Sequence, residues 1–188
     1  MTINRYLLAG LLCLGVAPAA IGCGFHSPLG VQLEGMYPGS LSVAVALRSA
    51  ADNGLIDAAA LEAPGTGTAL YSEAVHRLQA FRNALAASPT VAELPASFSL
   101  GYVESQLWAR YSQSDGKVRV DVHTDGPAEG EAVVLTGEPV LTEVLAGRLS
   151  VNRAVAEGMI LIEGNQSDKT AILDVLNTTS VANKISRR

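Results

Sequence analysis

The sequence predicts an α+β fold, in which a small, mostly antiparallel sheet is covered by helices on one face. Residues 68–87 and 168–176 carry apolar side chains at helical spacing, which is typical of amphipathic helices. Residues 117–122 alternate between apolar and polar side chains, as a half-buried strand does. Residues 138–164 read as helix, turn, short helix and strand. With 188 residues, of which 48% are hydrophobic, the chain can bury the core of one domain.

The chain is acidic, with a formal net charge of −5 and a pI near 5.1. Its only cluster of basic residues is Arg187-Arg188 at the C-terminus. Binding to a nucleic-acid backbone depends on a clustered positive surface, and docking on an anionic membrane depends on the same charge. The composition therefore argues against both, and no nucleic-acid partner is expected.

The first 22 residues have the layout of a secretory signal peptide. Arg5 supplies the positive start, residues 7–16 are apolar, and small residues follow. The apolar run is shorter than the roughly 20 residues of a transmembrane helix. The expected organisation is a signal peptide over 1–22, a tether over 23–39, one α+β domain over 40–179 and a frayed tail over 180–188. Within the domain, we expect a helical part over 40–92 and a sheet part over 95–179.

Two cleavage sites are compatible with this signal. Residues 17–19 form an Ala-x-Ala site, whereas residues 20–23 resemble the lipobox of bacterial lipoproteins, with Ala20 where that pattern prefers leucine or valine. In either case Cys23 is the only cysteine of the mature chain, so it cannot close an internal disulfide. Attachment of diacylglycerol to Cys23 would anchor the protein in a membrane. Gly24 is not the aspartate that retains such proteins in the inner membrane, so we expect an exported, outer-membrane or periplasmic protein.

Cys23 also permits a different interpretation. Cys23 and His26 have C-x-x-H spacing and, together with Met36, could share a soft metal such as copper or zinc. This set falls short of the four ligands of a closed site, and lipid attachment would remove the thiolate. A plain tether therefore competes with a metal-handling or redox-accessory role for this segment.

Two helices are expected in the N-terminal half. Ser40 caps the first, which ends near Gly54. The second covers 68–87, and Glu73 and His76 form a lone E-x-x-H there, which is typical of a solvated helix surface. The apolar stripe of the second helix comprises Leu70, Ala74, Leu78, Phe81 and Leu85.

Three strands are expected before residue 138. The first covers 103–111 and carries Trp108 on its polar side, where a tryptophan lines a ligand cleft or covers the edge of a sheet. A polar hairpin loop over 112–116 ends in Asp-Gly and leads to the second strand, 117–122. The third strand covers 132–136.

The unit over 138–164 is defined by turn and cap signals. Its first helix ends at Gly147, since glycine adopts the positive φ of a helix C-terminus without steric cost. Ser150 caps a second helical turn, which Gly158 ends. Residues 159–162 are apolar on both faces, as a buried strand would be.

Apolar positions and glycines of this unit form a longer pattern. Its members are Leu145, Gly147, Leu149, Ala154, Gly158, Ile160, Ile162 and Gly164. The pattern resembles the C-terminal part of the sterol-carrier-protein family over about residues 131–176. The resemblance implies an apolar tunnel between sheet and helices that binds a fatty acid, a sterol or a similar lipid, without a cofactor. For its wall we expect Trp108, Leu141, Leu145, Leu149, Met159 and Leu161, although each is also typical of an ordinary core.

Motifs of catalysis do not occur in the sequence. It contains no G-x-S-x-G, H-E-x-x-H, P-loop or paired-cysteine motif, and its three histidines are far apart in the chain. We therefore expect a protein that is not an enzyme and that binds an apolar ligand non-covalently. The alternatives are an envelope accessory lipoprotein that acts through a protein partner, and the metal-handling role of Cys23, His26 and Met36.

Overall fold

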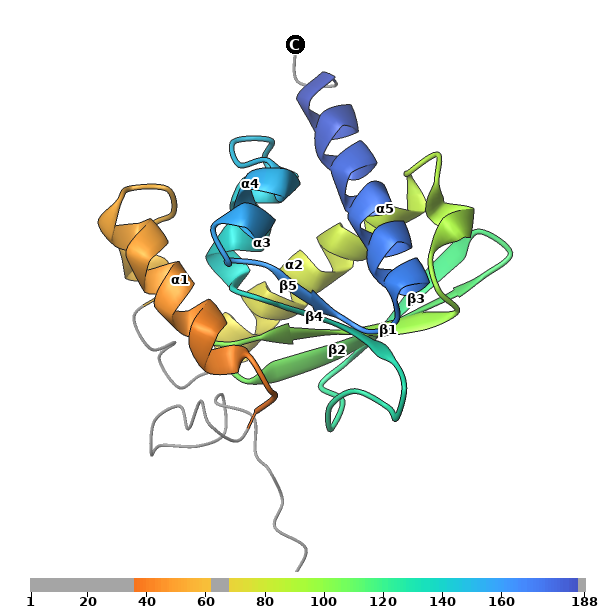
Figure 1. Cartoon of the computed structure of the whole chain (residues 1–188), viewed down its shortest axis with the longest axis horizontal. Helices are drawn as coiled ribbons and strands as arrows, with labels where there is room; N and C mark the ends of the chain where they lie inside the picture. Colours follow the sequence, from red (N-terminus) through yellow and green to blue (C-terminus); the bar gives the residue numbers. More distant parts are fainter. Residues whose placement is uncertain (1–35, 62–67, 186–188) are drawn as a thin grey trace, which may run out of the picture.

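The computed structural model describes residues 36–61 and 68–185. Figure 1 shows the helices gathered on one side of a single sheet. The helices are α1 (Ser40–Asp52), α2 (Thr68–Ala86), α3 (Glu138–Leu145), α4 (Val151–Ala156) and α5 (Gln166–Ile185), with 3₁₀ turns at Ala58–Leu61 and Val91–Glu93. The strands are β1 (Ser97–Tyr102), β2 (Leu107–Ser114), β3 (Lys117–Val122), β4 (Ala132–Thr136) and β5 (Leu161–Glu163).

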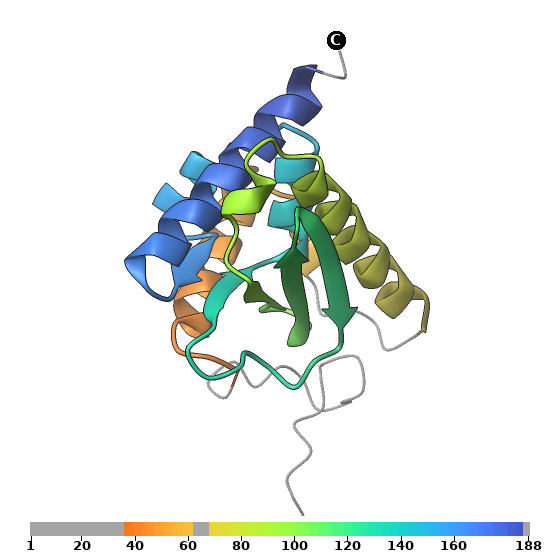
Figure 2. The same ribbon diagram turned by 90° about the vertical axis from the view of Figure 1, so that its right-hand side faces the viewer.

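The five strands are arranged in the order β3-β2-β1-β4-β5. β1 and β4 run parallel, whereas the pairs β1/β2, β2/β3 and β4/β5 are antiparallel. Figure 2 shows the connection between β3 and β4 passing along the side of the sheet that faces away from the helices. The predicted class, a small and mostly antiparallel sheet covered by helices on one face, is confirmed.

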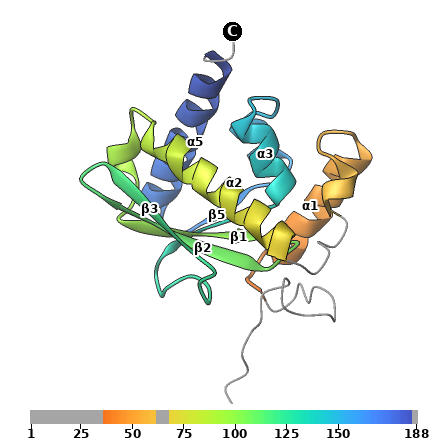
Figure 3. The ribbon, with the colours of Figure 1, turned by 180° about the vertical axis from the view of Figure 1, so that it is seen from behind.

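The core lies between the sheet and α2, which Figure 3 shows lying over the sheet beside β3. The ring of Phe98 on β1 stacks on that of Tyr111 on β2, with centroids 5.1 Å apart. Phe81 on α2 meets Tyr111 edge-on at 5.3 Å. The Tyr111 hydroxyl donates a hydrogen bond of 3.0 Å to the backbone oxygen of Leu78, so its buried polar atom is satisfied.

The predicted stripe of α2 is confirmed at four positions, where Ala74, Leu78, Phe81 and Leu85 are buried. The side chain of Leu70, the fifth position, lies outside the described residues. Elsewhere the helix boundaries differ. Gly39, with φ of 89°, stands at the N-cap of α1 instead of Ser40, whose buried hydroxyl has no partner among the described residues. α5 continues to Ile185, so the predicted end of this helix near Leu176 was wrong, whereas fraying of residues 180–188 stays a prediction.

The predicted strand over 103–111 was also wrong in its first half. The chain turns between Tyr102 and Leu107, and Gln106 has a positive φ of 52°. Val103 and Ser105 are both buried in this turn, so the apolar and polar alternation continues through it. That continuation conceals the boundary between β1 and β2, so β1 was not predicted as a separate strand. The hairpin after β2 is confirmed, with positive φ at Asp115 and Gly116.

The unit over 138–164 is confirmed in its order of elements. Gly147 and Gly158 have φ of 72° and 74° at the ends of α3 and α4. The Ser150 side chain accepts a hydrogen bond of 3.3 Å from the Arg153 backbone N–H. The strand is shifted, however: β5 begins at Leu161 and lies at the half-buried edge of the sheet, not within it.

Candidate functional site

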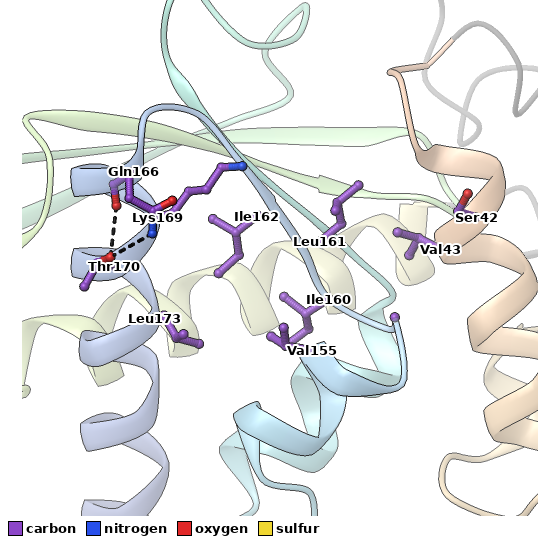
Figure 4. Close-up of a pocket in the computed structure, with 11 residues that line it drawn as sticks. Ser42, Val43, Val155, Ile160, Leu161, Ile162, Gln166, Lys169, Thr170 and Leu173 are labelled. Atoms are coloured by element: carbon purple, nitrogen blue, oxygen red, sulfur yellow. Dashed lines mark hydrogen bonds between the residues drawn. The ribbon is translucent and has the colours of Figure 1, made fainter.

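An apolar groove lies beside the edge strand β5, between α1 and α5 (Figure 4). Its volume is about 370 Å³. Its apolar lining consists of Val43 from α1, Val155 from α4, Ile160 just before β5, Leu161 and Ile162 from β5, and Leu173 from α5. Its polar lining consists of Ser42 from α1 and of Gln166, Lys169 and Thr170 from the start of α5.

The position of β5 explains why this groove exists. β5 has three residues and forms the end of the sheet, so its pairing with β4 uses only one of its sides. Ile162 pairs with Val134 and shares its face of the sheet, toward the helices. Val43 and Ile160 are buried at the floor, whereas Leu161, Ile162 and the other apolar lining residues are half-buried. The result is a concave apolar surface, which is the usual form of a site for a small apolar molecule.

One end of the groove is polar. Lys169 Nζ lies 3.3 Å from Glu163 Oε2, and both side chains are partly exposed. The Thr170 hydroxyl donates a hydrogen bond of 2.9 Å to the backbone oxygen of Gln166. The Asn165 side chain accepts a hydrogen bond of 2.9 Å from the Asp168 backbone N–H, so the first turn of α5 is already capped. The groove therefore combines an apolar floor with a cationic side chain at one end.

Of the six residues predicted to line a ligand cavity, Leu161 lines this groove. Leu141, Leu149 and Met159 are buried in the core, and Leu145 is half-buried against it. The structure thus places these four side chains away from the groove, whereas Val43, Val155 and Leu173 were not predicted. Val43 and Leu173 are ordinary apolar residues of amphipathic helices. Helical spacing alone does not show that α1, α4 and α5 converge on one strand.

Trp108, the sixth predicted residue, lies on the opposite face of the sheet. It stands three residues from Tyr111, which faces the helices, and alternation turns it the other way. Trp108 packs onto Gly101, where a Cβ would lie 2.8 Å from Trp108 Cζ3 and 2.7 Å from Met36 Cε. The Tyr37 ring meets Trp108 edge-on at 6.0 Å. Trp108 therefore covers the far face together with Met36 and Tyr37.

Met36 was also a candidate metal ligand, and its packing against Gly101 accounts for it as an apolar residue. Cys23 and His26 lie outside the described residues, so their part in a metal site stays a prediction. Within 36–61 and 68–185, no three histidine, cysteine, aspartate or glutamate residues lie close enough together to hold a metal ion. In the same ranges, no helix combines the length and the apolar composition of a membrane span.

A buried polar cluster joins α2, α3 and the turn after β1. The Glu138 backbone N–H, at the start of α3, donates a hydrogen bond to the Glu104 carboxylate. Arg77 of α2 pairs with the Glu138 carboxylate and donates a hydrogen bond of 2.9 Å to Thr142 Oγ1. The pKa of Glu104 is raised to about 7, mainly by burial and to a smaller extent by the nearby charge of Glu138, against the opposing effect of two backbone hydrogen bonds. Burial also raises the pKa of Tyr102 well above its usual value.

A second carboxylate, that of Glu131, accepts several hydrogen bonds on the face of the sheet opposite the helices. Glu131 Oε2 accepts hydrogen bonds of 2.7 Å from Ser99 Oγ and 2.9 Å from the Ala128 backbone N–H. Arg110 Nε lies 3.2 Å from the same carboxylate, and Arg110 also donates a hydrogen bond of 3.0 Å to the Gly126 backbone oxygen. These contacts fasten the connection between β3 and β4 to β1 and β2. Burial alone would raise the pKa of Glu131, but its hydrogen bonds and the Arg110 charge together lower it.

Glu131→Gln is expected to lower the free energy of unfolding by about 1–3 kcal/mol at pH 7, because Arg110 and Ser99 lose a charged acceptor. Since the folded-state pKa is lowered, the contribution of Glu131 is complete above its ordinary value of 4.5 and disappears as the pH falls through the folded-state pKa. Urea unfolding at pH 7 and pH 3 measures both effects. A difference between wild type and variant that is equal at the two pH values would contradict this account.

No protein-family model matches the sequence, and no curated protein matches it significantly. The solved structures that it resembles include sterol carrier protein 2 like 2 from Aedes aegypti, with a TM-score of 0.43 and 15% identity, over 56% of this chain and 98% of that chain. Another is a UbiJ-SCP2 ubiquinone synthesis protein, with a TM-score of 0.42 and 12% identity, over 56% of this chain and 94% of the other.

A third similar structure is the sec-alkylsulfatase Pisa1 from Pseudomonas sp., with a TM-score of 0.41 and 15% identity over 52% of this chain. The match covers only 15% of the sulfatase. All three TM-scores are below 0.5, and the function of this chain is therefore argued from its own residues.

Proposed function

We propose that this protein binds a lipid-like small molecule non-covalently in the groove beside β5. The observation that carries the proposal is the convergence of six apolar side chains on one concave surface; they come from α1, α4, α5 and residues 160–162. Most of them are only half-buried, so a ligand would remove further apolar area from water, at about 25 cal/mol per Å². The described lining residues include no carboxylate or imidazole, which suits binding without catalysis.

We further propose that the chain is exported and held at a membrane through Cys23. The support comes from the signal-peptide pattern over 1–22 and from the unpaired cysteine that follows it. Met36 follows Cys23 by thirteen positions in the sequence (36 − 23), and a chain of that length spans at most about 45 Å. A Cβ at Gly39 would lie 2.5 Å from Leu161 Cδ2, so the chain enters α1 directly beside the groove. An anchor at Cys23 would therefore keep the groove close to the membrane.

Leu173→Trp tests the binding site, because an indole in place of a half-buried leucine would fill part of the groove. We expect the protein without residues 1–22, carrying Cys23→Ser, to take up a fluorescent fatty acid. Leu173→Trp is expected to weaken this uptake at least tenfold, while Val45→Trp, on the exposed face of α1, leaves it unchanged. Fluorescence titration measures the affinities, and circular dichroism confirms that both variants fold. Equal uptake by both variants would overturn the assignment of the groove.

A second candidate function is supported by the outer face of α1. Leu41 and Val45 lie one helical turn apart and are 53% and 61% exposed. Two neighbouring aliphatic side chains on a surface suit contact with a protein partner in the cell envelope. The double variant Leu41→Glu/Val45→Glu would lose a partner that co-purifies with the wild type and would keep lipid uptake. If the wild type and this variant retain the same proteins, this second function fails.

A further inference from the structure

The groove has a defined polarity. Among the described residues that line it, Lys169 alone carries a charge. Lys169 stands on the first turns of α5, and Val43 and Ser42 line the groove from α1 on its other side. Figure 4 shows the Lys169 side chain extending from α5 toward β5, with the apolar side chains of the floor beyond it. A ligand that follows this surface would meet an ammonium group at one end and aliphatic side chains along the rest.

The present partner of Lys169 does not belong to the groove. Glu163 pairs with Val133 in the sheet and is not among the residues that line the groove. The side chains of Lys169 and Glu163 are 34% and 43% exposed, and exposed ion pairs of this kind contribute little to stability. An incoming anion can therefore replace Glu163 at Lys169 at low cost. Asp168, the other nearby acid, accepts a hydrogen bond of 2.7 Å from Asn165 and does not line the groove.

The size of the groove limits the apolar part of the ligand. A volume of about 370 Å³ is close to the lower end of ligand sites, which range over roughly 300–1,000 Å³. One unbranched alkyl chain fits such a space better than two chains do. The groove is not fully enclosed, so a head group can remain hydrated at its rim.

We infer that the groove selects single-chain amphiphiles with an anionic head group, and that Lys169 is the residue that determines this selectivity. The inference rests on the proposed lipid-binding function and adds the charge and the orientation of the ligand. The alkyl chain lies over Ile162, Ile160 and Val43, and the head group displaces Glu163 from the Lys169 ammonium. A carboxylate, a sulfate and a phosphate share the required chemistry.

Isothermal titration of the protein without residues 1–22, carrying Cys23→Ser, with decanoate, decyl sulfate, decyl phosphate, decanol and decyltrimethylammonium tests the selectivity. All three anions are expected to bind at least tenfold more tightly than decanol, because a charge-assisted hydrogen bond is added to the same alkyl contact. The order of the three anions by affinity identifies the preferred head group. Lys169→Met, which keeps an unbranched side chain, is expected to remove this advantage, so that the three anions bind the variant no more tightly than decanol does. Lys169→Arg is expected to retain it, and Lys117→Met on the exposed edge strand β3 is the matched control for loss of a charge.

Glu163→Gln is an independent test, because it is expected to raise the affinity for an anion, whereas Lys169→Met is expected to lower it. It removes the competing anion, and we expect it to raise the affinity for decanoate roughly twofold to fivefold. Equal binding of decanoate and decanol, with no effect of Lys169→Met, would overturn the charge selectivity and leave the lipid-binding function standing. If neither decanoate nor decanol binds the wild type, the proposed function itself fails, and the selectivity fails with it.

Discussion

Phe98→Ala is expected to lower the free energy of unfolding by about 3–5 kcal/mol. Phe98 is buried and lies parallel to Tyr111, with an angle of 13° between the ring planes. Phe81 completes the cluster by meeting Tyr111 edge-on, so one ring on β1 supports the contact between β2 and α2. Removing that ring leaves a cavity at the centre of the core and also removes the aromatic contact.

Urea denaturation, followed by circular dichroism, measures this loss. Phe98→Leu keeps most of the volume, and we expect it to cost less than the alanine variant, so that a folded protein can be compared even if Phe98→Ala unfolds. Leu41→Ala on the exposed face of α1 is the matched surface control and is expected to change stability by less than about 0.5 kcal/mol. A cost below about 1 kcal/mol for Phe98→Ala would show that this cluster is not the centre of the core.

Glu104→Gln is expected to stabilise the protein above pH 7. Burial raises the pKa of Glu104 from 4.5 to about 7, so the folded state binds a proton more strongly than the unfolded state does. Stability therefore decreases as the pH rises from about 4.5 through 7, and it is lowest when the buried carboxylate is charged. The difference between the two pKa values corresponds to roughly 3 kcal/mol. Glutamine avoids this cost, and its amide oxygen can still accept from the Glu138 backbone N–H.

Chemical denaturation at pH 5, 6, 7 and 8 measures the effect. The wild type should lose stability over this range relative to Glu104→Gln, and the two should converge toward pH 4.5. Glu129→Gln, on the exposed connection between β3 and β4, controls for the loss of one negative charge. A constant difference between wild type and Glu104→Gln across the range would contradict a raised pKa at this position. A lower stability of the variant at pH 8 would mean that the charged Glu104 is needed at the start of α3.

The parts of the fold that could be predicted depend on local signals. Gly147 and Gly158 have the positive φ that favours glycine, and Ser150 accepts the hydrogen bond of an N-cap. The two helices of the unit over 138–164 and their ends were therefore predictable without any knowledge of their neighbours, although its strand was not placed correctly. The same holds for the Asp115-Gly116 turn, which needs positive φ at both positions.

The parts that were missed depend on tertiary contacts. Val103 and Ser105 are buried in a turn because the ends of β1 and β4 meet there, and the Val103 backbone N–H donates to the Thr136 oxygen at 3.0 Å. Their side chains alternate in burial as those of a strand do, although the backbone there forms a turn. Similarly, Met159 is buried before β5 begins, because its backbone oxygen accepts from the Thr136 hydroxyl at 3.0 Å. A run of apolar residues does not distinguish this arrangement from a buried strand.

The candidate site was even less predictable from local signals, because it depends on the packing of several helices. The groove needs Val43, Val155 and Leu173, which lie on three helices, and Val43 precedes the other two by more than a hundred residues. Each is an ordinary apolar residue of an amphipathic helix, and only the packing of these helices around the edge strand brings them together. Leu161 was predicted because it belongs to the unit over 138–164, where the local signals are strong.

Methyl NMR of isoleucine, leucine and valine side chains, recorded during titration with decanoate, tests the central claim most directly. If the ligand lies in the groove beside β5, the methyl signals of Ile160, Leu161, Ile162 and Leu173 will shift together, with one affinity. The signals of Leu141 and Leu149, in the core, will stay in place. Shifts centred on Leu141 and Leu149 would instead place the ligand between the sheet and the helices, and a spectrum without shifts would contradict ligand binding by this protein.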